Sequence, residues 1–170
     1  MIREIVVYPD KRLKLVSREV EEFNGALHDL LDDMYDTMVQ SNGVGLAAIQ
    51  VGVDQRVLII NEPDENDAQR KENTLEMINP VIIERNGATK YQEGCLSVPG
   101  YYDEVERYKY VKVEYFDRHG QSQTIEDDGF LAIAMQHEMD HLDGKVFVEK
   151  LSFTKRKRFE KDWKKRQKTS

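Results

Sequence analysis

The pattern of apolar residues predicts an α-helix in two stretches of the sequence. In the first stretch the apolar positions recur at the helical spacing: Leu27, Leu30, Leu31, Met34 and Met38. This stripe predicts a helix that packs on a core and ends near Gln40, because Ser41-Asn42-Gly43 supplies a glycine for the left-handed cap. In the second stretch, residues 130–135 are apolar on every side, which predicts a helix buried within the core.

Several short segments are predicted to be β-strands. Apolar residues at 111, 113 and 115 alternate with Lys112 and Glu114, which is typical of a half-buried antiparallel strand. Residues 56–61, of which 57–60 are apolar, predict a buried strand, and further strands are expected within 5–8, 77–84, 91–98 and 122–126. The pair Asn86-Gly87 favours a hairpin turn, and Pro99-Gly100 favours a second turn.

The remaining segments complete an α+β pattern. Residues 62–74 are almost wholly polar and predict an exposed loop, whereas Phe159 and Trp163, four residues apart, indicate a C-terminal helix packed by its aromatic edge. Because strands and helices do not alternate regularly, we expect an α+β fold with small antiparallel sheets packed around the buried helix. A length of 170 residues suits a single domain, residues 1–170, with one core.

The composition limits the class of protein. Hydrophobic residues make up 39% of the chain, enough for one core, but no apolar run approaches the length of a membrane span. The N-terminal residues 1–5 lack the apolar region of a secretion signal, so we expect a cytoplasmic protein with no membrane contact. The single cysteine, Cys95, excludes an intramolecular disulfide and is free to act as a nucleophile or a metal ligand.

Positive charge is concentrated at the C-terminal end. Residues 155–170 contain nine basic and two acidic residues, although the net charge of the whole chain is -7. An acidic body with a basic segment at 154–170 is typical of a tethered contact with a polyanion such as nucleic acid. A solvated basic helix that only aids solubility is the alternative, and charge alone does not decide between them.

The buried helix continues into His137-Glu138-Met139-Asp140-His141, an HExxH pattern. Histidines four residues apart face the same side of a helix, so both imidazoles can converge on one metal ion, with Glu138 beside it to move protons. Burying these groups without a partner would cost several kcal/mol. A metal ion removes that cost, whereas a satisfied histidine pair without a metal is the alternative.

A catalytic metal usually has a third protein ligand and an open position. The extended pattern with a third histidine fails here, because Phe147 occupies that position. Two candidates remain: Glu160, which lies in the basic segment, and Cys95, within Glu93-Gly94-Cys95-Leu96-Ser97. A cysteine thiolate binds divalent ions strongly, and Gly94 permits a close backbone approach. Glu160 would instead indicate a metalloprotease, and a closed structural site with an RNA-binding tail is a third hypothesis.

The glycine-rich residues 43–52 suit a substrate wall better than a nucleotide site. They match the dinucleotide fingerprint, but a helix precedes them, and too few residues follow before the next strand for a βαβ crossover. Their backbone could instead accept an extended substrate. Gln50 could then donate its side-chain amide to a developing oxyanion, unless it is simply a surface loop residue.

Three segments together, residues 43–50, 93–97 and 136–141, resemble the signature motifs of peptide deformylase, and the similarity runs from about residue 5 to about residue 151. The resemblance implies removal of the formyl group from the N-terminal formyl-methionine of newly synthesised proteins. It implies one divalent metal ion, Fe²⁺ expected and Zn²⁺, Ni²⁺ or Co²⁺ as replacements, held by Cys95, His137 and His141. Metal-bound hydroxide would attack the formyl carbon, with Glu138 as general acid/base.

The resemblance also implies a binding site. Gln50 and the backbone N–H of Leu96 would form the oxyanion hole. The extended peptide would lie between the backbone of Val44-Gly45 and residues 94–96, which include Gly94. Five residues would line a pocket for the methionine side chain: Val44, Tyr91, Phe130, Ile133 and Ala134. Related bacterial enzymes can dock their C-terminal helix on the ribosome, a contact that the basic segment here could make.

Overall fold

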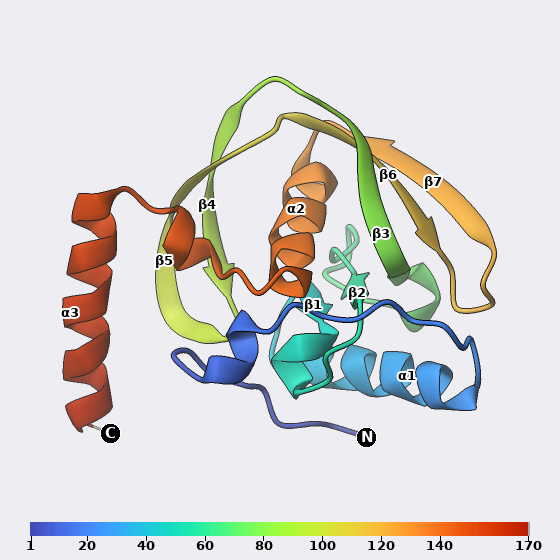
Figure 1. Ribbon diagram of the computed structural model, residues 1–170, viewed down its shortest axis with the longest axis horizontal. Helices are drawn as coiled ribbons and strands as arrows, with labels where there is room; N and C mark the ends of the chain where they lie inside the picture. Colours follow the sequence, from blue (N-terminus) through green and yellow to red (C-terminus); the bar gives the residue numbers. More distant parts are fainter. Residues whose placement is uncertain (170) are drawn as a thin grey trace.

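The computed structural model describes residues 1–169 and shows strands arched over a central helix (Figure 1). The helices of this part of the chain are α1 (Gly25–Gln40), α2 (Phe130–Leu142) and α3 (Phe153–Thr169). The strands are β1 (Gly45–Ala47), β2 (Val57–Ile60), β3 (Leu75–Asn86), β4 (Thr89–Cys95), β5 (Val98–Arg107), β6 (Tyr110–Phe116) and β7 (Ser122–Asp127). One antiparallel sheet has the order β1-β2-β3-β6-β7, and β4 pairs with β5 in a second. The predicted α+β class is therefore confirmed.

Strand β2 lies between two helices and is buried on both faces. Leu58 and Ile60 belong to the apolar cluster that surrounds α2, whereas Val57 and Ile59 belong to the cluster that covers the predicted stripe of α1. A continuous apolar strand is stable only when both faces are covered, and each buried branched side chain contributes about 1.5–3 kcal/mol. The two helices thereby fix the position of β1, which pairs with β2 at the edge of the sheet.

Helix α2 is held at both ends. At its start, the Asp127 carboxylate accepts hydrogen bonds from the backbone N–H groups of Gly129 and Ala132, both at 2.9 Å. At its end, the Arg56 guanidinium donates to the Leu142 carbonyl at 3.0 Å and pairs with Asp143 at 3.0 Å. Such contacts satisfy backbone groups that a helix terminus leaves without partners. The two histidines of α2 therefore sit on a rigid element.

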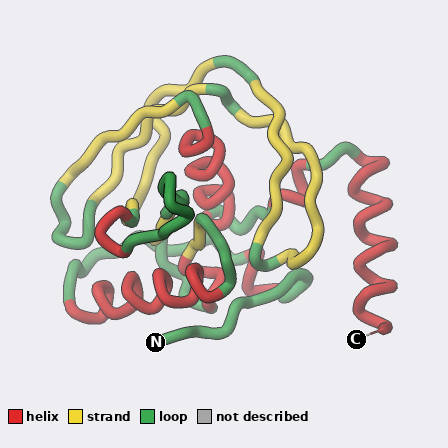
Figure 2. The backbone as a smooth tube through the Cα atoms, turned by 180° about the vertical axis from the view of Figure 1, so that it is seen from behind, coloured by secondary structure: helices red, strands yellow, loops and turns green. Residues whose placement is uncertain are grey.

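Helix α3 packs at one side of the molecule, next to the β4–β5 pair (Figures 1 and 2). Its buried aromatic side chains are Phe159 and Trp163, as the four-residue spacing predicted. They share a cluster with Phe147 and the inner residues of β5, and the Trp163 indole donates to the Tyr8 carbonyl at 3.0 Å. The aromatic edge therefore anchors the helix and leaves its basic side chains outside.

Some local predictions are wrong. Residues 5–8 are not a strand, because the backbone of Val6 and Tyr8 bonds to two separate segments, at Gln50 and Ser97. Gly87 has a positive φ of +69°, but no hairpin forms, since β3 pairs with β2 and β6 whereas β4 pairs with β5. The strand expected within 77–84 is longer, because β3 runs through Pro80 with only a register shift between Ile78 and Val81. The turn expected at Pro99-Gly100 lies three residues earlier, at Leu96-Ser97, and Pro99 and Gly100 belong to β5, which begins at Val98.

Candidate metal centre

The two histidines of the HExxH pattern lie on one face of α2, with ring centroids 5.1 Å apart. His141 is completely buried, and His137 lines a cavity open to solvent. This placement agrees with the periodicity argument, because residues four apart are stacked one turn from each other. The His141 imidazole therefore lies in the buried part of the site, and the His137 imidazole faces the cavity.

Cys95 completes a group of three possible ligands. It stands at the end of β4, where the register with β5 shifts, and its Sγ lies 3.4 Å from His141 Nε2. Within residues 1–169, potential ligand atoms of Cys95, His137 and His141 lie within 4.8 Å of one another, and no fourth such residue joins them. A set of three protein ligands leaves room for a water or a substrate atom, as a catalytic metal site requires.

Glu160 does not join this group. It lies on α3, its side chain is 42% exposed, and its carboxylate pairs with Arg156 one helical turn away at 3.5 Å. A carboxylate that is exposed to water and paired with an arginine needs no metal ion to compensate its charge. The hypothesis of a metalloprotease with Glu160 as third ligand is therefore wrong.

The protein atoms in the centre fit a divalent cation. His141 Nδ1 and Glu138 Oε1 are both buried, and neither has a hydrogen-bond partner in the described part of the chain. Burial lowers the pKa of His141 well below its ordinary value, which keeps the imidazole neutral. One cysteine sulfur and two imidazole nitrogens suit iron, zinc, nickel and cobalt in their divalent states. The donor set is that of a transition-metal site rather than a calcium or magnesium site.

A buried ion pair orients His137. Its Nδ1 lies 2.8 Å from a Glu93 carboxylate oxygen, so Nε2 faces the centre. Glu93 in turn accepts two hydrogen bonds of 2.8 Å from Arg107, whose remaining nitrogen donates to Asp140 at 2.6 Å. Burial would raise the pKa of Glu93, but Arg107 and His137 lower it, so the carboxylate stays charged. Such partners fix the orientation and tautomer of a ligating histidine.

Glu138 is buried in contact with the glycine segment. A Cβ on Gly45 would lie 2.6 Å from Glu138 Oε2, so only glycine permits this approach. Burial raises the pKa of the Glu138 carboxyl to about 7, although the neighbouring His137 acts in the opposite direction. A carboxyl group with such a pKa can take up or release a proton near neutral pH.

Gln50 points into the site rather than to solvent. It lies in the 3₁₀ helix Ala48–Val51 and is 1% exposed, so its interpretation as a surface loop residue is wrong. The backbone N–H of Ala47 donates to its amide oxygen at 2.9 Å, and its amide nitrogen donates to Ser97 Oγ at 3.1 Å and contacts Cys95 Sγ at 3.4 Å. The amide donor is thereby aimed at the candidate metal centre.

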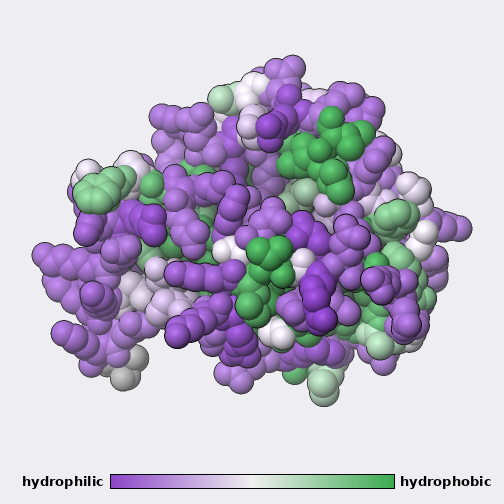
Figure 3. Space-filling view, in the orientation of Figure 1, coloured by the Kyte–Doolittle hydropathy of each residue, from purple (hydrophilic) through white to green (hydrophobic). Residues whose placement is uncertain are grey.

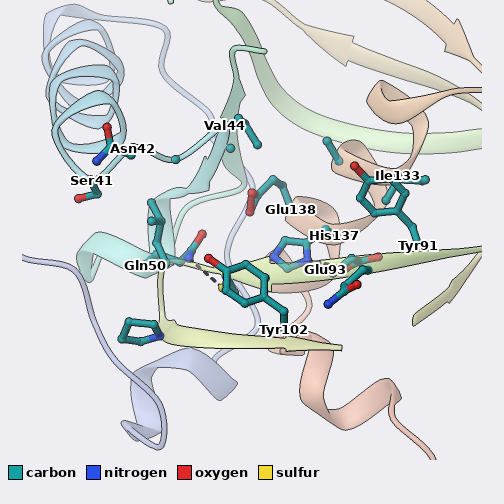
Figure 4. A pocket seen from close by; sticks show the side chains of 18 of the residues that line it. Ser41, Asn42, Val44, Gln50, Tyr91, Glu93, Tyr102, Ile133, His137 and Glu138 are labelled. Atoms are coloured by element: carbon teal, nitrogen blue, oxygen red, sulfur yellow. Dashed lines mark hydrogen bonds and ion pairs between the residues drawn. The ribbon is translucent and has the colours of Figure 1, made fainter. Parts of the chain in front are cut away.

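A cavity of about 490 Å³ opens above these groups (Figure 4). Leu96 and every residue that was predicted to bind substrate line it: Val44, Gly45, Tyr91, Gly94, Phe130, Ile133 and Ala134. Tyr91 and Phe130 are in ring contact at 5.9 Å, next to Ile133 on α2, and form an apolar side of the cavity. The structure thus brings together the residues of all three sequence segments.

Further residues of the site were not identified from the sequence. Ser41, Asn42, Pro99 and Gly100 also line the cavity. Glu93 and Ser97 lie within the motif around Cys95, so their positions next to a candidate ligand were a usable signal. Arg107 had none, because only the pairing of β4 with β5 brings it to Glu93.

The comparisons with known proteins agree with this geometry. The family model described as Polypeptide deformylase matches residues 2–157. The chain belongs to the peptide deformylase family. It is 56% identical to the peptide deformylase of Nautilia profundicola over 164 aligned residues. The alignment covers 96% of this chain and 94% of that protein. It is 53% identical to the peptide deformylase of Campylobacter jejuni over 169 aligned residues. This alignment covers 99% of this chain and 97% of that protein.

Solved structures of this family share the fold. The peptide deformylase of Legionella pneumophila superposes with a TM-score of 0.89 at 42% identity, over 99% of this chain and 98% of that one. The Ehrlichia chaffeensis enzyme in complex with actinonin superposes with a TM-score of 0.87 at 42% identity, over 97% of each chain. Peptide deformylases are metal-dependent enzymes that remove the formyl group from nascent peptides. No helix within residues 1–169 is long and apolar enough to span a membrane.

Proposed function

We propose that this chain removes the formyl group from the N-terminal formyl-methionine of nascent proteins at the centre formed by Cys95, His137 and His141. The observation that carries the proposal is the meeting of these three ligands beside Glu138, whose buried Oε1 has no hydrogen-bond partner among residues 1–169. We propose one divalent ion, Fe²⁺, with Zn²⁺, Ni²⁺ or Co²⁺ as replacements. When bound, such an ion would polarise a carbonyl oxygen and lower the pKa of a water molecule.

Glu138 is the proposed proton carrier. Its carboxylate takes a proton from the attacking water and passes that proton to the amine nitrogen that leaves when the C–N bond breaks. Burial against Gly45 keeps the carboxylate at one position, which favours transfer over a short distance. The products are formate and a peptide with a free amino terminus.

Gln50 and the backbone N–H of Leu96 are the proposed donors to the developing oxyanion. The Gln50 amide is fixed by Ala47 and Ser97, so little reorganisation is needed when charge develops. Each preorganised donor is worth about 2–4 kcal/mol in the transition state. The amide would exchange its contact with Cys95 Sγ for the substrate oxygen.

The cavity walls are proposed to bind the peptide. The backbone of Val44 and Gly45 on one side and of residues 94–96 on the other would hold an extended chain by hydrogen bonds. The methionine side chain would occupy the apolar side formed by Tyr91, Phe130 and Ile133, with Val44 and Ala134 at its edges.

Release of formate is the direct test of this function. Anaerobically purified protein with stoichiometric Fe²⁺ is expected to release formate from a formyl-methionyl tripeptide, and the acetylated peptide, which has no formyl group, is the blank for the formate assay. Formate is measured with a coupled dehydrogenase. Metal-loaded protein that cleaves an internal peptide bond and releases no formate would contradict the proposal.

We further propose that the chain acts in the cytoplasm and that α3 contacts the ribosome. Lysines 157, 161, 164 and 168 lie along one exposed side of α3, away from Phe159 and Trp163, and Figure 3 shows a largely hydrophilic surface over this helix. A row of cations on a helix anchored by its opposite side suits a polyanionic surface such as ribosomal RNA.

Reversing three of these charges tests the contact. The variant with Lys157, Lys161 and Lys164 each changed to Glu is expected to bind ribosomes about tenfold more weakly at low salt. The reason is that each substitution replaces a positive charge with a negative one on the same surface. Formate release from a tripeptide should be unchanged, since α3 contributes no residue to the cavity. Cosedimentation with ribosomes measures the first effect, and equal binding by variant and parent chain would refute the contact.

A further inference from the structure

The polar segment between β2 and β3 is attached to the back of the cavity wall. Its sequence predicted an exposed loop, and most of its residues are exposed, but Gln69 is half-buried. The Gln69 side-chain amide donates to the Gly43 carbonyl at 2.8 Å and to the Asn61 carbonyl at 2.7 Å. A side chain in a surface loop thus bonds to the glycine segment that lines the candidate site.

The contact extends the ladder between β1 and β2. Within the ladder, Gly45 lies opposite Ile60, and beyond it the backbone N–H of Asn61 donates to the Val44 carbonyl at 2.8 Å. The chain then leaves the sheet, so the Gly43 carbonyl has no strand residue opposite it. The amide of Gln69 supplies the missing donor, and it uses both hydrogens of one nitrogen to join the two segments.

Gln69 is itself held in place from two sides. The Tyr35 hydroxyl of α1 donates to the Gln69 carbonyl, and Lys71 pairs with Asp32 one turn earlier on the same helix. Asn61, which is buried, donates from its side chain to the Arg70 carbonyl at 2.8 Å. A loop anchored on both neighbours can transmit the rigidity of α1 and β2 to residues 43–45.

The other side of residues 43–45 faces the reacting groups. A Cβ on Gly43 would lie 2.6 Å from the Leu96 side chain, and a Cβ on Gly45 would lie 2.6 Å from the Glu138 carboxylate. The segment therefore has Gln69 behind it and the proposed oxyanion-hole and proton-transfer residues in front. A small shift of the segment would weaken the hydrogen bonds that it can form with the backbone of a bound peptide.

We propose that Gln69 is a positioning residue that fixes residues 43–45 as the peptide-binding wall. This inference rests on the proposed function, since it assumes that the wall binds the substrate backbone. Gln69 contacts neither a candidate metal ligand nor Glu138, so its loss affects the binding of the peptide more than the chemical step. The effect should grow with peptide length, because longer peptides form more hydrogen bonds with the wall.

Kinetics of Gln69→Glu test the proposal. The substitution keeps the shape of the side chain but replaces the amide nitrogen, which donates to the Gly43 and Asn61 carbonyls, with a carboxylate oxygen that repels them. We expect the KM for a formyl-methionyl tripeptide to rise about tenfold while kcat changes less than about twofold, with a smaller effect on formyl-methionine alone. Gln69→Met, which removes the donors without adding charge, should have the same effect and provides the measurement if Gln69→Glu does not fold.

The controls separate this inference from the proposed function. Gln121→Glu makes the same change at an exposed glutamine between β6 and β7 and should leave KM unchanged. If the unaltered chain releases formate but both Gln69 variants keep its KM, or lose activity equally on formyl-methionine and the tripeptide, the positioning role is wrong. If the unaltered chain releases no formate, the proposed function itself fails.

Discussion

Replacing Cys95 with alanine is expected to abolish metal binding and formate release together. The substitution removes the sulfur that lies 3.4 Å from His141 Nε2 and leaves two imidazoles, which hold a divalent ion weakly. The loss of activity should exceed the 10- to 100-fold effect that is typical of losing a residue behind a metal ligand. Elemental analysis and formate release, measured on the same anaerobic sample, check both parts.

The matched control is Glu160→Ala, which removes the competing candidate ligand. This variant should keep its metal content and its activity, because Glu160 is half-exposed and its carboxylate pairs with Arg156 on the same helix. Full metal content and activity in Cys95→Ala would show that the centre is built from other residues, and the account of the site would then be abandoned.

Changing Glu138 to glutamine should separate catalysis from metal binding. The variant keeps Cys95, His137 and His141, so its metal content should equal that of the parent chain. Because the amide cannot carry the proton, kcat should fall by about 10²–10⁴-fold, whereas KM should change little. The near-identical shape of glutamine also preserves the packing against Gly45, so a fall in kcat reports proton transfer.

Glu104→Gln, at an exposed position on β5, is the control for this substitution and should have the activity of the parent chain. A structural metal site predicts a different result, because function would survive the loss of Glu138. Retained kcat in Glu138→Gln, with formate still released, would therefore move the chemistry away from this carboxylate.

The sequence predicted the site where local spacing determines geometry. The apolar residues 130–135 place α2 in the core, and the four-residue step then puts His137 and His141 on one face. Cys95 could be selected only by elimination and by resemblance, because its distance from His141 depends on how β4 lies against α2. The same reasoning explains why Arg107 was missed, since strand pairing rather than sequence spacing brings it to Glu93.

The errors in the fold come from tertiary contacts that override local signals. Gly87 does adopt the positive φ that a hairpin turn requires, but β3 pairs with β2 and β6, so the chain passes to a second sheet. Gln69 was not distinguished from its polar neighbours, because nothing in the sequence shows that one side-chain amide meets the Gly43 carbonyl. Polarity predicted the exposure of this loop but not its attachment.

X-ray absorption at the metal edge of anaerobically purified protein tests the central claim most directly. The spectrum should be fitted by one sulfur and two imidazole nitrogens, with any remaining ligand a light atom from water, and Cys95→Ala should give no metal edge because it does not retain the ion. A first shell without sulfur, or one filled by four protein ligands, would contradict a catalytic centre formed by Cys95, His137 and His141.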